Sequence, residues 1–233
     1  MYAAAPSRRA CAILLLRAAS TIRASAASTP TDALVTTVAK ALYDMPSPPQ
    51  IVAFATGGGI QLASQLLTVP GSSRSVLDVQ MPYSRGSLVQ ILGQEPKKYC
   101  SATVARDLAT AAYERARTLR DAGAGPAVGV GCTAALRSEP MKRGMHRCFV
   151  AVHTDRGTYE LTLNLAKGAR SRVLEDAVVS RIALVGLARA CDVDLDAAQS
   201  DALWRLPADD AADEGGTRAA VEDERLEIAF TPT

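Results

Sequence analysis

The sequence of 233 residues is poor in aromatic side chains, which make up 4% of it, and it lacks long apolar runs. A surface that stacks the bases of single-stranded nucleic acid needs several aromatic rings in one place, and the sequence has no such cluster. A membrane-spanning helix needs roughly 18 consecutive apolar residues, whereas the longest candidate here, residues 10–16, is far shorter. We therefore expect neither a nucleic-acid-binding surface nor a membrane span.

Cysteine is scarce and its spacing does not fit a metal site. None of the five cysteines lies in a C-x-x-C pair, and neither histidine has a cysteine partner at zinc spacing; these residues are Cys11, Cys100, Cys132, Cys148, Cys191, His146 and His153. The pattern predicts reduced thiols in an intracellular protein, with no metal and no cofactor.

Acidic residues are absent from the first thirty positions, which contain four arginines and many alanines and serines. Residues 10–23 can form a helix with Ile13, Leu14 and Leu16 on one side and Arg17 nearby. This composition is typical of an organelle transit peptide, so residues 1–30 are predicted to direct import into the mitochondrial matrix. A secretory signal, a plastid signal and a plain N-terminal tail are the alternatives.

The whole sequence is 48% hydrophobic, which is enough for one domain with a thick core. Apolar runs or alternation predict strands at 51–55, 75–81, 127–132, 147–154 and 158–165, and helical spacing predicts helices at 31–44, 59–69, 84–92, 101–122 and 170–191. The order predicts an α/β fold, a single three-layer sandwich domain over 31–206 with a mixed sheet and helices on both faces. Glycines in the 127–132 strand would let a helix backbone or a ligand approach closely.

The last segment, residues 207–233, contains eight acids against two arginines. We expect a solvated acidic tail, with residues 227–230 as a candidate short docking strand. The net charge of residues 31–206 is too mild to indicate binding to a nucleic-acid backbone.

Three turns carry the candidate ligand-binding residues. Gly57, Gly58 and Gly59 follow the first strand directly, and amides at the start of the next helix could bind a phosphate or a carboxylate. Two hydroxyls follow a Pro-Gly turn, and a tyrosine and an arginine follow the next strand; the residues are Ser72, Ser73, Tyr83, Ser84 and Arg85. Each turn also has a purely structural interpretation. In that interpretation the glycines only form a tight turn, the serines only cap the next segment, and the tyrosine and arginine are an exposed pair without a ligand.

Together, these turns resemble the C-terminal domain of the CinA family, the nicotinamide-nucleotide amidohydrolases. The family pattern E-S-C-T-G-G, V-P-G-S-S and Y-S-N-E-A-K appears here as F-A-T-G-G-G from Phe54, V-P-G-S-S from Val69 and Y-S-R-G-S-L from Tyr83. Weaker matches follow, at V-G-V-G-C-T from Val128 and at Gly168, Ala169 and Arg170, so that the resemblance covers about residues 33–192. It implies a CinA-like fold and self-association, with a homodimer through the helical faces.

In the family, a serine of the first turn is thought to attack the amide, a lysine five residues after the tyrosine activates it, and the tyrosine assists. Here the serine position falls on Phe54 or Ala55 and the lysine position on Leu88. Neither half of the reacting pair is present. Thr56 remains as a replacement nucleophile if a base such as Lys97 or His146 reaches it.

Two functions follow from these departures. The first is a non-catalytic or catalytically altered amidohydrolase-like domain in the mitochondrion, which binds a phosphate-bearing nucleotide at the three turns, with Thr56 included, or serves as a structural subunit with a protein partner. The second is an active amidohydrolase that acts on an amide or nucleotide through Thr56 and Tyr83. His146 and His153 are expected to be satisfied structural groups, and Cys132 a small buried filler.

Overall fold

The first apolar run forms a strand near the middle of the parallel half of the sheet. β1 (Gln50–Thr56) lies between β2 (Val76–Gln80) and β3 (Ala127–Ala135) and is parallel to both. All of its residues except Thr56 are buried. Because both faces of the strand are covered, its sequence is apolar without alternation.

The computed structural model describes residues 30–140, 142–209 and 218–233. Residues 34–233 form one compact unit, and of the other unit, residues 1–33, only residues 30–33 are described. The predicted transit peptide at 1–30 therefore lies outside the described residues, apart from Pro30.

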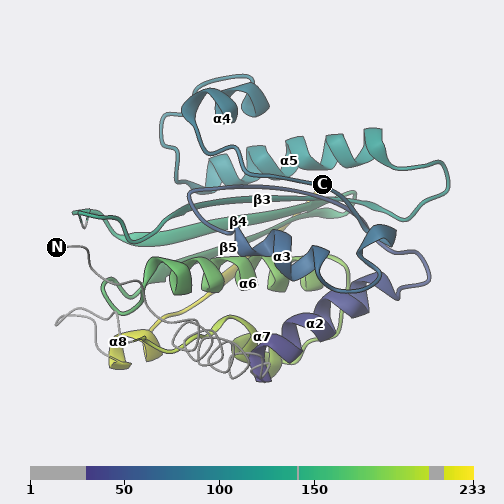
Figure 1. Cartoon of the computed structure of the whole chain (residues 1–233). Helices are drawn as coiled ribbons and strands as arrows, with labels where there is room; N and C mark the ends of the chain where they lie inside the picture. The colour runs from purple at the N-terminus through teal and green to yellow at the C-terminus, as the bar shows by residue number, and fades with distance from the viewer. Residues whose placement is uncertain (1–29, 141, 210–217) are drawn as a thin grey trace, which may run out of the picture. The chain divides into compact units, whose positions relative to one another are not determined.

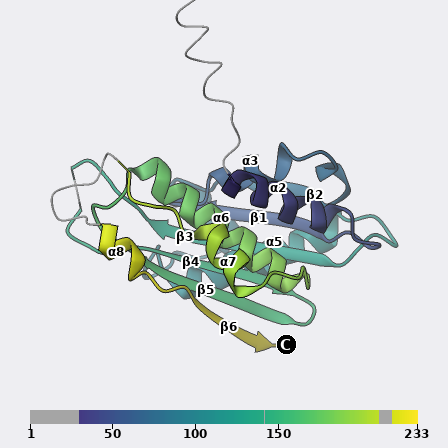
Figure 2. The same ribbon diagram turned by 90° about the horizontal axis from the view of Figure 1, so that it is seen from below.

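The second half of the sheet is antiparallel. β4 (His146–Thr154) and β5 (Gly157–Leu165) form the predicted hairpin, and β6 (Glu227–Pro232) pairs with β5. The strand order is β2-β1-β3-β4-β5-β6, so that β2 and β6 are the two edges (Figure 2). Part of the acidic segment from residue 207 is thus structured, and its end supplies a sixth strand where a short strand was predicted.

Helices cover both faces of the sheet, as predicted (Figure 1). On one face lie α4 (Arg85–Leu92) and α5 (Ala102–Leu119), and on the other lie α3 (Gln61–Leu67) and α6 (Arg172–Ala190). The remaining described elements are α2 (Pro30–Tyr43), the 3-10 turn η1 (Ser72–Arg74), α7 (Ala197–Trp204) and α8 (Arg218–Glu222). The three-layer α/β architecture is therefore confirmed, whereas α7 was not predicted.

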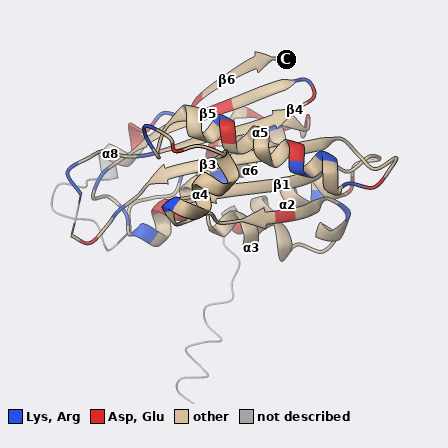
Figure 3. Ribbon diagram, turned by 90° about the horizontal axis from the view of Figure 1, so that it is seen from above, with Lys and Arg blue, Asp and Glu red and all other residues tan. Residues whose placement is uncertain are grey.

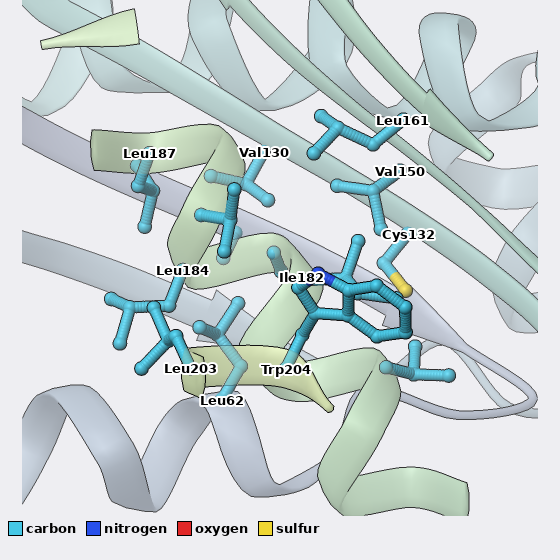
Figure 4. Packing of buried hydrophobic residues seen from close by; sticks show 14 of the residues in the cluster. Leu62, Val130, Cys132, Val150, Leu161, Ile182, Leu184, Leu187, Leu203 and Trp204 are labelled. Carbon is cyan, nitrogen blue, oxygen red and sulfur yellow. The ribbon is translucent and has the colours of Figure 1, made fainter. Parts of the chain in front are cut away.

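The main core lies between the sheet and α6. Figure 4 shows Trp204 and Ile182 packed with Val130 and Val150 of the sheet. α6 is buried on almost every side from Glu175 to Ala190, because further helices cover the side that faces away from the sheet. A helix covered all round needs an apolar surface all round, which explains the broad apolar pattern of its sequence.

An ion pair is buried on the α6 side. Arg170 donates to both carboxylate oxygens of Glu224, at 2.7 and 2.8 Å, and its Nε and Nη2 donate to the carbonyl of Leu206. Both side chains are at most 2% exposed. Glu224 is therefore not solvated, as an acidic tail would require, and it holds the end of the chain against the start of α6.

The opposite face is joined to α5 by close backbone contact. A Cβ on Gly129 would lie 2.1 Å from the carbonyl oxygen of Ala109, and one on Gly131 would lie 2.1 Å from that of Ala105. The glycines of β3 thus admit a helix backbone, which decides between the two interpretations of this strand. Charged residues of both signs lie along the outer side of α5 (Figure 3).

Candidate functional site

A pocket of about 320 Å³ opens at the carboxyl ends of the parallel strands. Thr56 ends β1, Tyr83 follows β2, and Thr133 lies opposite Thr56 near the end of β3. Ligands of open α/β sheets bind at this edge. The lining residues are Thr56, Gly57, Tyr83, Ser84, Arg85, Leu88, Tyr99, Cys100, Thr133 and Ala134.

The structure brings together only part of the predicted site. Thr56, Gly57, Tyr83, Ser84 and Arg85 line this pocket. Gly58 and Gly59 are not among its lining residues, and neither are the two serines after the Pro-Gly turn, Ser72 and Ser73, which belong to η1. The three turns therefore do not converge on one pocket.

The glycine turn is shaped by packing against β3. Gly57 has a φ of 75°, and a Cβ there would lie 2.1 Å from the carbonyl oxygen of Ala134. At Gly58 a Cβ would lie 2.6 Å from a methyl carbon of Leu136. A side chain at Gly57 would displace the backbone of β3, and one at Gly58 would displace the side chains of Leu136 and Ala134. The turn therefore needs glycine at position 57 even without a ligand.

A carboxylate of the chain itself binds the amides after the glycine turn. The backbone N–H groups of Ile60 and Gln61 each donate to a carboxylate oxygen of Asp176, on α6, at 3.1 Å. Asp176 is 8% exposed. The start of a helix favours negative charge, and this contact supplies it from within the protein. The amides that the sequence suggested for a phosphate are thus already occupied.

The hydroxyl of Thr56 is engaged, and the two bases suggested from the sequence lie elsewhere. Its Oγ1 donates to the backbone carbonyl of Pro82 at 2.9 Å. His146 is fully buried and its Nδ1 lies 2.5 Å from a carboxylate oxygen of Glu175. Lys97 lines a separate pocket between α4 and α5. Neither base proposed from the sequence lines the pocket that contains Thr56.

Hydrocarbon occupies the positions of the expected reacting pair. Phe54 is 3% exposed and Leu88 is 2% exposed, and both belong to the buried cluster beneath α5. Ala55 is equally buried in the cluster on the α6 side. None of these side chains can act as a nucleophile or a base.

Arg85 is neutralised by a neighbouring carboxylate. Its guanidinium binds both oxygens of Glu95, with a Nε to Oε1 distance of 2.8 Å, and the hydroxyl of Tyr99 donates to the same Oε1 at 2.8 Å. The hydrogen bond from Arg85 lowers the pKa of Glu95, and Glu95 in turn raises the pKa of Tyr99.

Ser84 caps α4 by accepting from the amide of Ser87 at 3.2 Å. Tyr83, in contrast, is 68% exposed.

Sequence reasoning missed the four lining residues that come from later segments, which are Tyr99, Cys100, Thr133 and Ala134. Tyr99 and Cys100 directly precede Ser101, the cap of α5, and the hydroxyl of Thr133 donates to the carbonyl of Tyr99 at 2.8 Å. Burial raises the pKa of the Cys100 thiol, which disfavours its reactive thiolate form. Thr133 lies opposite Thr56 in the pairing of β1 with β3, so a prediction of this pairing would have identified Thr133 as a lining residue.

The other cysteines and histidines behave as structural groups. Cys132 is fully buried, and burial raises its pKa well above the usual value, which confirms a buried filler. Nδ1 of His153 lies 2.7 Å from the hydroxyl of Thr158. Cys100, Cys132, Cys148 and Cys191 are free thiols. Within the described ranges, no cluster of three metal-binding side chains and no helix long and apolar enough to cross a membrane is found.

Comparisons with known proteins give a match at the level of fold. No family model matches the sequence, and no curated protein matches it. Among solved structures, the competence-damaged protein (CinA) superfamily protein of Escherichia coli aligns with a TM-score of 0.50 and 18% identity, over 71% of this chain and 92% of that one. A competence/damage-inducible protein of Agrobacterium tumefaciens aligns with a TM-score of 0.48 and 17% identity, over 70% and 95% of the two chains. The predicted resemblance is confirmed for the fold: the chain has a CinA-like fold.

Proposed function

We propose that this chain is an amidohydrolase-like domain without amidase activity, which serves as a structural subunit in the mitochondrion. The observation that carries the proposal is the burial of Phe54, Ala55 and Leu88 at the positions of the expected serine and lysine. A hydrolytic site needs an activated nucleophile next to a base, and loss of such a set typically costs several powers of ten in rate.

The polar groups of the pocket also argue against turnover. The hydroxyls of Thr56 and Thr133 donate to backbone carbonyls, and the charge of Arg85 is balanced by Glu95. Because these groups are already engaged, the pocket offers little to stabilise the oxyanion of an amide in its transition state.

The first experiment measures nicotinamide release from nicotinamide mononucleotide by the wild type, Thr56→Ala and Cys100→Ser. These two variants remove the hydroxyl and the thiol that line the pocket. We expect no turnover above the buffer rate in any of the three proteins. Turnover by the wild type that either substitution abolishes would overturn the proposal and restore the alternative of an active enzyme.

The second experiment separates a structural subunit from a nucleotide-binding one. Calorimetry compares nicotinamide mononucleotide with nicotinamide riboside, which differ only in the phosphate. Because Asp176 already binds the amides of the glycine turn, we expect no binding that depends on the phosphate. Tight binding of the mononucleotide alone, lost on Arg85→Ala, would instead favour the nucleotide-binding function.

The mitochondrial location rests on the composition of residues 1–30. Fluorescence microscopy of the tagged full chain is expected to show mitochondrial staining. A matched variant with Arg8, Arg9, Arg17 and Arg23 changed to Gln is expected to stay in the cytosol. Secretion of the wild type, or equal distribution of the two proteins, would contradict this location.

A further inference from the structure

The outer edge of β6 is open and apolar. All six residues of the strand are exposed, including Ile228 at 41% and Phe230 at 47%. Both side chains lie on the α6 side of the sheet, since they pair with Leu161 and Tyr159 of β5. In Figure 2, β6 is the outermost strand of the sheet, with the C-terminus at its tip. An exposed edge strand with large apolar side chains is a template for strand pairing.

The backbone groups of β6 that point away from the sheet can be identified from its hydrogen bonds with β5. The amide of Thr233 donates to the carbonyl of Arg156, so Thr233 faces β5. Residues of an antiparallel strand alternate in direction, and hence Thr231, Ala229 and Glu227 also face β5. The N–H and C=O groups of Ile228 and Phe230 therefore point away from the sheet. Pro232 falls in the outward set too, where its missing N–H breaks no bond to β5.

The other edge of the sheet is protected. On β2, Asp78 binds Arg115 of α5 at 2.5 Å and accepts from Gln80 at 2.7 Å. Every residue of β2 is at least partly covered. Charged and covered edges resist pairing, whereas the segment 228–230 of β6 contains no charge, no proline and no bulge in its register with β5.

We infer that β6 is a dimerisation strand, which pairs antiparallel with β6 of a second copy of this chain about a two-fold axis at Ala229. In this register Ile228 lies opposite Phe230 of the second copy, and the reverse pair follows by symmetry. The outward groups then exchange four backbone hydrogen bonds, and the two sheets join into one. This inference does not depend on the proposed function.

The register suits two identical strands. Glu227, the only charged residue of β6, lies opposite Thr231 of the second copy, so no like charges meet. Isoleucine faces phenylalanine at both outward pairs, and aromatic side chains paired with β-branched ones stabilise antiparallel strands. The two-fold arrangement is closed, whereas pairing of β6 with β2 of another copy would continue into a filament.

Two matched double variants test the register by sedimentation equilibrium of the full chain. Ile228→Lys with Phe230→Lys places lysines opposite each other across the two-fold axis, whereas Ile228→Lys with Phe230→Glu places opposite charges there. Both remove the same apolar side chains. We expect the wild type to dimerise, and the dimer of the Lys/Lys variant to dissociate about tenfold or more readily than that of the Lys/Glu variant.

Thermal unfolding followed by circular dichroism checks that both variants are folded, and equal melting temperatures are expected in dilute solution. A monomeric wild type would overturn the inference. So would equal dissociation constants for the two variants, which would indicate a contact without this register. A dimer that persists unchanged in the Lys/Lys variant would place the interface elsewhere, for example on the helical faces.

Discussion

The two faces of the sheet are held by different means. On the α6 side the charged groups Arg170, Glu175 and Glu224 are buried, and each is bonded to a partner within the protein. On the α5 side, ion pairs such as Arg106 with Glu160, at 3.1 Å, are half exposed, and the close fit comes from glycine backbone.

Because of this difference, the stability of the protein should respond to different kinds of substitution on the two faces. Exposed ion pairs contribute little to stability, whereas a buried charge that loses its partner is costly. A glycine under a helix is sensitive to size but not to charge. We therefore expect the α6 side to respond most strongly to loss of charge, and the α5 side to respond to added volume.

The largest effect is expected for Glu224→Gln, which leaves the buried guanidinium of Arg170 without its counter-charge. Because the remaining hydrogen bonds cannot neutralise it, the free energy of unfolding should fall by about 3 kcal/mol. Urea unfolding measures this loss. The exposed neighbour provides the control, since Glu222→Gln should leave the midpoint unchanged.

The comparison becomes sharper if both charges are removed together. Arg170→Met combined with Glu224→Leu replaces the pair by apolar groups and should lose less stability than Glu224→Gln alone. A double variant that is less stable than the single variant would mean that the hydrogen bonds to Leu206, and not the charge pair, dominate at this site.

An intermediate effect is expected for Gly131→Ala. The new methyl carbon would lie 2.1 Å from the carbonyl oxygen of Ala105 and 2.4 Å from the amide nitrogen of Ala109, and a helix backbone cannot yield locally. Stability should fall by about 2 kcal/mol. Gly86→Ala is the matched control, because a Cβ there meets nothing within 4 Å and alanine favours the helix. Equal melting temperatures of the two variants would contradict the close fit.

The smallest effect is a pH dependence on the α5 side. Partial burial lowers the pKa of His153 below its usual 6.5. As the pH falls below 6.5, the unfolded chain gains a proton that the folded chain resists, so stability should decrease. Unfolding midpoints across this range should show a slope that His153→Gln reduces. An unchanged slope in that variant would assign the pH dependence to other groups.

Much of the fold could be predicted because its signals are local. The apolar run of β1, the caps Ser84 and Ser101, and the glycine after α4 mark element ends through contacts within a few residues. Helix α7 was missed although Asp196 and Gln199 form a capping box, since no long apolar face accompanies the short helix.

The site was predictable only where its residues follow the ends of β1 and β2. Thr56, Tyr83 and Arg85 were assigned together and line one pocket. Asp176 could not be assigned to the glycine turn, because its partner Ile60 lies 116 positions away in sequence. The same holds for Arg170 and Glu224, which are 54 positions apart. Such pairings depend on how the layers assemble, and no local pattern encodes them.

The carboxylate of Asp176 has a consequence for any ligand that approaches the glycine turn. A tethered group competes at a high effective concentration, whereas a free phosphate competes only at the concentration of the solute. A phosphate that displaced this intramolecular competitor would leave a buried carboxylate without its two amide donors, which is costly. The turn therefore discriminates against free anions by mass action alone, before any feature of their shape is considered.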